Sequence, residues 1–141
     1  MTRKWALPFY AWSIFRVKHL SYKSGIQISW KTQIGKGFYI GHFGTIVVSP
    51  NAVLGENVNI SQGCCVGAAN RGKRKGAATI GNCVYLGPGC KVVGAVTIGN
   101  DVCVGANAVV TNDIPDEACV GGIPAKVLSM DGVEFYIEKT V

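Results

Sequence analysis

The sequence is poor in charge, poor in histidine and, before Glu56, entirely without acidic residues. Charged residues make up 16% of the 141 residues and hydrophobic residues 48%, which excludes a disordered chain and is enough for one domain with a buried core. No apolar run is long enough to span a membrane. The opening apolar stretch runs into Arg16 without a signal-peptide cleavage pattern. We therefore expect a cytoplasmic protein.

The six cysteines form neither a secreted disulfide framework nor a zinc pattern. They have no C-x-x-C spacing, so we expect reduced thiols, several of them small core residues. The only histidines are His19 and His42, too few for a three-histidine metal site. The net charge of +6 comes without a Cys/His finger or an RNA-binding aromatic motif. The sequence therefore predicts no metal and no nucleic-acid partner.

What the sequence does contain is a repeat of six residues. Aliphatic residues recur at this spacing in two runs, at Val48, Leu54, Ile60 and Val66, and at Ile80, Leu86, Val92, Ile98, Val104 and Val110. A six-residue unit suits a short strand plus a corner, and three such units make one coil of about 18 residues in a triangular prism. The spacing predicts an all-β fold, a left-handed parallel β-helix in which the aliphatic residues stack inside.

Two interruptions of this repeat mark candidate functional segments. One lies between Ile40 and Val48, around His42. The other is GAANRGKRKGAAT, between Val66 and Ile80, which predicts a protruding loop at about 67–79. Irregular segments on a regular scaffold tend to carry function.

The repeat also divides the chain into three segments. Residues 25–128 form the β-helix domain, and residues 129–141 form a C-terminal tail. Residues 1–24 are basic and aromatic, where Pro8 can open a helix and Gly25 can follow its end. We expect this short helix to cap the open end of the β-helix. The alternative is a helix that lies on the inner membrane face, giving the protein a peripheral membrane contact.

The stretch from about Gly25 to Leu128 resembles the serine acetyltransferase branch of the hexapeptide-repeat acyltransferases. Three segments carry the resemblance: IGKGFYIGHFGTIVVSPNAVLGENVNISQG, the glycine- and lysine-bearing loop after CCVGAA, and TNDIPDEACVGGIPAKVL near the end. The resemblance implies an O-acetyltransferase that uses acetyl-CoA as co-substrate. It also implies a homotrimer with sites at the subunit junctions.

The resemblance places His42 at the position of the family's general base. A hydroxyl is a poor nucleophile, and an imidazole that titrates near neutrality can take its proton as the bond forms. Gly41 stands where the family has an acid, and Gln27 aligns with its upstream aspartate. We expect Gln27 to orient the His42 ring. The alternative from the residues alone is a non-catalytic structural or binding β-helix in which His42 only packs.

Seven small or basic residues are candidates for binding acetyl-CoA. They are Gly67, Ala68, Lys73, Gly87, Gly105, Ala106 and Lys126. Gly87, Gly105 and Ala106 resemble residues of the family's pantetheine channel, where small side chains leave room for an extended arm. The two lysines are candidates for phosphate contacts, and an ordinary solvated lysine is the alternative for each.

Two classes of acceptor fit these residues. L-Serine carries an ammonium that needs a counter-charge, and Asp101 and Asp113 are the acids considered for it. A sugar needs neutral polar groups and an aromatic surface, and the candidates are Gln27, Trp30, Tyr39, Phe43 and Asn70. Shortened relatives without the family's helical N-terminal domain resemble O-acetyltransferases of surface polysaccharides. We therefore expect a surface-polysaccharide sugar as acceptor, with L-serine as the alternative.

Overall fold

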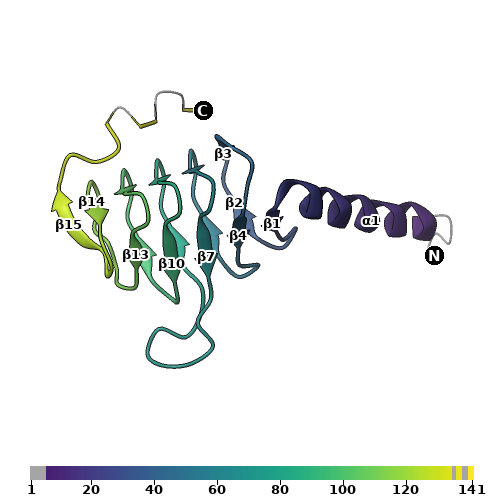
Figure 1. The fold of residues 1–141 in the computed structure, drawn as a ribbon, viewed down its shortest axis with the longest axis horizontal. Helices are drawn as coiled ribbons and strands as arrows, with labels where there is room; N and C mark the ends of the chain where they lie inside the picture. Colours follow the sequence, from purple (N-terminus) through teal and green to yellow (C-terminus); the bar gives the residue numbers. More distant parts are fainter. Residues whose placement is uncertain (1–5, 135, 138–139) are drawn as a thin grey trace.

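The computed structural model describes residues 6–134, 136–137 and 140–141 and is a three-sided parallel β-helix of about five coils (Figure 1). Sheet A contains β1 (Ile26–Ile28), β4 (Ile46–Val48), β7 (Cys65–Gly67), β10 (Lys91–Val93) and β13 (Val109–Val110). Sheet B contains β2 (Gln33–Ile34), β5 (Val53–Leu54), β8 (Thr79–Ile80) and β11 (Thr97–Ile98). Sheet C contains β3 (Tyr39–Ile40), β6 (Asn59–Ile60), β9 (Tyr85–Leu86), β12 (Cys103–Val104), β14 (Cys119–Gly121) and β15 (Lys126–Ser129). The parallel β-helix predicted from the six-residue repeat is confirmed.

The aliphatic repeat forms the core because equivalent residues of successive coils lie in register. In sheet C, Ile60 pairs with Leu86 and Leu86 with Val104, and all three side chains are fully buried. Sheet B repeats the arrangement with Leu54 and Ile80. Each apolar side chain therefore lies between its equivalents in the coils above and below.

A ladder of polar side chains holds the corner between sheets B and C. The Oδ1 atom of Asn82 accepts the Glu56 backbone N–H at 2.8 Å, and that of Asn100 accepts the Asn82 N–H at 2.8 Å. Gly81 lies beside this ladder, where a Cβ would be 2.6 Å from the Gly99 carbonyl oxygen. The backbones therefore approach more closely at this position than any other residue would allow.

Helix α1 (Ala6–Ser24) extends away from β1 along the long axis of the molecule (Figure 1). Phe9, Trp12 and Phe15 are 69%, 56% and 66% exposed. The expected helix is present, but it does not lie across the open end as a cap would. Within the described residues, no helix combines the length and apolar character of a membrane span. Residues 1–5 of the expected N-terminal segment lie outside the described residues.

The C-terminal tail turns back along sheet C (Figure 1). Strand β15 pairs antiparallel with β14, and the Cys119 thiol then donates to the Gly132 carbonyl at 2.9 Å. Tyr136 stacks on Tyr85 with ring centroids 4.7 Å apart. The Val141 backbone N–H donates to Asn57 Oδ1 at 3.0 Å. The tail therefore runs along sheet C and its corner with sheet B.

We predict that Leu86→Ala lowers the free energy of unfolding by about 2–5 kcal/mol, because the stack between Ile60 and Val104 cannot close around the lost atoms. Thr79→Ala is the control, since the Thr79 side chain is exposed on sheet B and should change stability by less than about 0.5 kcal/mol. Denaturant titration measures both. Equal effects would show that the stacked interior is not the main source of stability.

Candidate active site

His42 lies in a corner loop that is longer than the next corner in the stack. Five residues separate Ile40 from Ile46, whereas three separate Ile60 from Cys64 in the next coil. The surplus residues leave His42 and Phe43 exposed to solvent, Phe43 by 86%. Among the described residues, no side-chain hydrogen bond restrains the His42 ring. The longer corner therefore presents an imidazole at the surface without fixing its orientation.

Gln62 lies directly beneath this loop. A Cβ placed on Gly44 would be 3.3 Å from the Cβ of Gln62, so the two segments are in van der Waals contact. The Oε1 atom of Gln62 is buried and has no hydrogen-bond partner among the described residues. An acceptor in this state is uncommon in folded proteins.

In the two coils that follow, a lysine side chain bridges the corner between sheets C and A. Lys91 lies on the outer side of β10, and its Nζ donates to the Gly63 and Gly89 carbonyls at 2.6 Å each. An ammonium has three N–H donors, so one remains for another acceptor. The ridge that begins at His42 therefore carries an ammonium in the coils that follow.

The predicted protruding loop is a short hairpin at the other edge of sheet A. Ala69 and Gly76 exchange backbone hydrogen bonds of 2.8 and 2.9 Å. Arg74 Nη1 donates to both carboxylate oxygens of Asp113, at 2.7 and 2.8 Å. The hydrogen bonds from Arg74, together with one from the Thr97 backbone N–H, hold the pKa of Asp113 below its ordinary value. Asp113 therefore anchors the hairpin (residues 69–76), while Lys73 stays exposed near its tip.

The six cysteines are free thiols, as the sequence predicted. Cys64 and Cys90 lie inside the β-helix with their sulfur atoms 3.6 Å apart. The hydrogen bond to Cys64 and burial both raise the pKa of the Cys90 thiol. Burial likewise raises the pKa of Cys103 to about 12. Neither of these two thiols is poised to act as a nucleophile at neutral pH.

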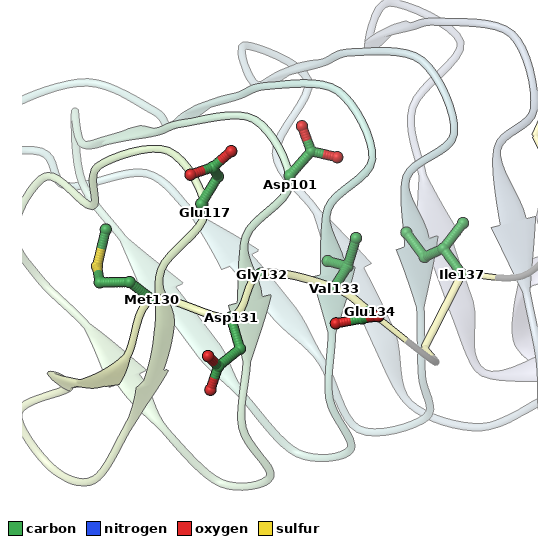
Figure 2. A pocket seen from close by; sticks show the side chains of 8 residues that line it. All are labelled: Asp101, Glu117, Met130, Asp131, Gly132, Val133, Glu134 and Ile137. Carbon is green, nitrogen blue, oxygen red and sulfur yellow. The ribbon is translucent and has the colours of Figure 1, made fainter.

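Acidic residues gather on a different side of the molecule. A depression of about 520 Å³ lies between the corner of sheets B and C and the tail, and its acidic lining residues are Asp101, Glu117, Asp131 and Glu134. Figure 2 shows that their carboxylates point in different directions instead of converging. Within the described residues, no group of three or more His, Cys, Asp or Glu could hold a metal ion. The depression therefore has no metal-site geometry.

Comparisons with known proteins agree with this architecture. The family model for bacterial transferase hexapeptide repeats matches residues 77–112. A serine acetyltransferase of Staphylococcus aureus (strain Mu50 / ATCC 700699) is 36% identical over 110 residues, covering 78% of this chain and 52% of the relative. This chain belongs to the hexapeptide-repeat transferases, on their serine acetyltransferase-like branch. It spans about half the length of the relatives that it matches.

Solved structures of other members of this hexapeptide-repeat branch have the same fold. A serine acetyltransferase in complex with CoA has a TM-score of 0.75 and 27% identity, covering 88% of this chain and 51% of the other. The Neisseria gonorrhoeae serine acetyltransferase in complex with serine has a TM-score of 0.71 and 29% identity, covering 79% and 46%.

The hexapeptide-repeat architecture places most of the predicted site residues along one ridge, the corner between sheets C and A. His42 follows β3, Gly87 follows β9, and Gly105 with Ala106 follows β12. Lys126 joins this ridge at its end, where it pairs with Gly121.

The remaining predicted residues lie elsewhere. Gly67 and Ala68 lead into the hairpin that carries Lys73, across sheet A from the ridge. Gln27 is exposed on the outer side of sheet A, in register with Val47. No hydrogen bond among the described residues joins Gln27 to His42.

Neither acid considered for the serine ammonium lies at the His42 corner. Asp113 is bound to Arg74, and Asp101 lies by the tail, three strands away from His42 in sheet C. Sequence reasoning also missed Gln62 and Lys91. Gln62 could have been found from its position in the six-residue repeat, because it lies in the coil next to the interrupted corner.

We predict that Asp113→Asn loosens the hairpin, so that trypsin cleaves after Arg71 or Lys73 several-fold faster at pH 8. Asp131→Asn removes the same charge at an exposed residue without an ion pair among the described residues and is the control. Unchanged cleavage in Asp113→Asn would mean that the ion pair does not anchor the hairpin.

The same anchor should depend on pH in a defined direction. Because the pKa of Asp113 is lowered in the folded state, its contribution is complete above the ordinary carboxyl pKa of about 4 and is lost as the pH falls through the lowered value. Amide NMR signals of residues 69–76 should therefore stay constant from pH 7 to pH 5 and change only in more acidic solution.

Proposed function

We propose that this chain transfers an acetyl group from acetyl-CoA to a hydroxyl, with His42 as the general base. The observation that carries this proposal is the surface position of His42. The imidazole is exposed at one of the two corners where the coil departs from its repeat, at the start of the ridge between sheets C and A. The similarity to serine acetyltransferases, one of them in complex with CoA, supports the same reaction.

The chemistry needs only a neutral imidazole and an open approach. His42 takes the proton of the acceptor hydroxyl while the oxygen attacks the thioester carbonyl. The tetrahedral intermediate then collapses, the carbon–sulfur bond breaks, and the imidazolium returns its proton to the sulfur of CoA. The products are the acetyl ester and free CoA, and His42 is again neutral.

The donor would lie along the ridge below His42. Gly105 and Ala106 lie at the surface of this ridge, where their small size leaves room for an extended pantetheine arm, whereas Gly87 in the preceding coil is buried beneath the Val104 carbonyl. Lys126 ends this ridge and Lys73 lies on the hairpin, and both are exposed. These cations suit the phosphates of CoA.

L-Serine is the acceptor that the similar proteins favour, because they are serine acetyltransferases and one was solved with serine bound. Lys91 offers one unused N–H donor near the His42 corner for a carboxylate. A sugar hydroxyl, expected from the sequence, is the second candidate. The observation in its favour is that none of the described acidic residues lies on the His42 corner to meet an ammonium.

A second copy of the chain would complete the site. The His42 ridge and the hairpin lie at opposite edges of sheet A, so one chain cannot bring Lys73 to His42. The described tail contacts are on sheet C and its corner with sheet B, at Cys119, Tyr85 and Asn57, so they leave the outer side of sheet A open to a second copy. A homotrimer with its threefold axis parallel to the axis of the β-helix would place the hairpin of one copy against the ridge of the next.

We predict that the protein acetylates L-serine with acetyl-CoA and that His42→Asn lowers kcat by about 10²–10⁴-fold. His19→Asn removes the other histidine, which lies on α1, and should retain activity. A thiol-release assay with L-serine and a panel of monosaccharides and surface oligosaccharides measures both rate and acceptor. Transfer to a glycan alone would exclude serine as the acceptor and leave His42 as the proposed general base. Full activity in His42→Asn would exclude the proposed mechanism.

The shared site predicts complementation between two inactive variants. One carries His42→Asn, and the other has the hairpin tip shortened. In trimers assembled at random from equal amounts, about a quarter of the junctions combine an intact ridge with an intact hairpin. Co-expression should therefore restore about a quarter of the wild-type activity, provided that sedimentation shows a trimer. Activity no greater than that of the separate variants would contradict the shared site.

A further inference from the structure

The amide oxygen of Gln62 is a buried acceptor without a donor. Its Oε1 atom is closed off from water and makes no hydrogen bond with any described residue. Exchanging the oxygen and nitrogen of the amide would leave a buried donor at the same place, so the assignment does not remove the mismatch. A buried polar group in this state weakens the fold and calls for a partner that joins it in another state of the protein.

The His42 loop is a segment in contact with Gln62 that can supply a donor. Gly44 packs on the Cβ of Gln62, and His42 is only two residues away. The imidazole is exposed and unrestrained, and Gly44 has a φ of +138°, a backbone conformation open mainly to glycine. A change at Gly44 can therefore turn the ring from solvent toward Gln62.

We propose that Gln62 is the positioning residue for His42, its amide oxygen accepting one N–H of the imidazole. That bond fixes which ring nitrogen is unprotonated and directs it toward the acceptor hydroxyl. It also stabilises the imidazolium that forms as the hydroxyl is deprotonated. The assignment rests on the proposed function for the role of His42 as base, but the hydrogen bond itself does not require it.

Gln62 suits this role better than Gln27, the residue expected from the sequence. Gln27 is exposed on the outer side of sheet A, where water satisfies its amide. The oxygen of Gln62 has no such alternative, so a hydrogen bond to His42 gains more there than at an exposed site.

No acid competes with Gln62 for the His42 ring. The titratable groups on the segments packed against the loop are Tyr39 beside Gly41, the Cys64 thiol, the Lys91 ammonium and Lys23 in the last turn of α1. The Cys64 thiol donates to the Gly87 carbonyl at 3.1 Å, and Lys91 to the Gly63 and Gly89 carbonyls. None of the described residues on these segments is a carboxylate. The amide oxygen is therefore the acceptor best placed for the ring.

The direct test is the pKa of His42, measured by NMR in the protein without substrate. Only two histidines are present, so His19→Gln assigns the signals. Gln62→Glu should raise the pKa of His42 by about one unit, because a carboxylate stabilises the imidazolium more than an amide does. Gln62→Met, which has no acceptor, should lower it. Gln33→Glu is the matched control, because Gln33 is exposed on β2 of sheet B, and this change should leave the pKa of His42 unchanged.

Stability and kinetics separate positioning from a structural role. Gln62→Met removes an unpartnered oxygen, so its Tm should equal or exceed that of the wild type while kcat falls about tenfold at constant KM. In Gln62→Glu, the acidic limb of the kcat/KM profile should move to higher pH with the pKa of His42. A lower Tm in Gln62→Met with an unchanged His42 pKa would mean that Gln62 only supports the fold, and would overturn the proposal.

The remaining outcomes distinguish the two proposals. If Gln62→Glu leaves the His42 pKa unchanged in an active enzyme, Gln62 does not position the ring. If Gln27→Glu moves the pKa and Gln62→Glu does not, the positioning residue is Gln27. If Gln62→Glu moves the pKa but the wild type transfers acetyl to no acceptor, the proposed function is wrong and the contact between Gln62 and His42 stands.

Discussion

The structure depends on the stacking of side chains inside the coils. Each inward residue lies between its equivalents above and below, as Leu86 lies between Ile60 and Val104. A change of register in one coil would break contacts with two others, so the repeat tolerates additional residues only at corners. This constraint explains why both irregular segments leave the prism at a corner and why the sheets on either side of them stay in register. The scaffold thereby fixes where a reactive group can be placed.

The two irregular corners differ in the way they are held. The hairpin is anchored by the ion pair of Arg74 with Asp113, which reaches across two coils. The His42 loop has no such anchor among the described residues and touches the coil below through Gly44. A rigid hairpin suits the binding of a fixed anionic group. A looser loop suits a base that must change orientation during a reaction.

Much of the fold could be predicted, because a period of six is visible in the sequence itself. The stacked residues, the protruding loop and the reduced cysteines all follow from spacing. The direction of α1 and the path of the tail over sheet C could not be predicted, since they depend on single contacts such as that of Tyr136 with Tyr85. At the site, His42 stood out through the broken register, whereas Gln62 and Lys91 looked like ordinary corner and strand residues. Their importance arises from neighbours one or two coils away.

The charge at the His42 corner limits what kind of partner the base can have. Lys91 places an ammonium on the following coils of this corner, where its Nζ is bound to the Gly63 and Gly89 carbonyls. A general base needs a group that stabilises the imidazolium as it forms, and none of the described acidic residues lies at this corner to do so. The ammonium opposes the positive charge that develops on His42 during proton transfer. The amide dipole of Gln62 would offset that effect once the imidazole ring turns toward it. An amide oxygen can do this without the net charge that a carboxylate would bring to the corner.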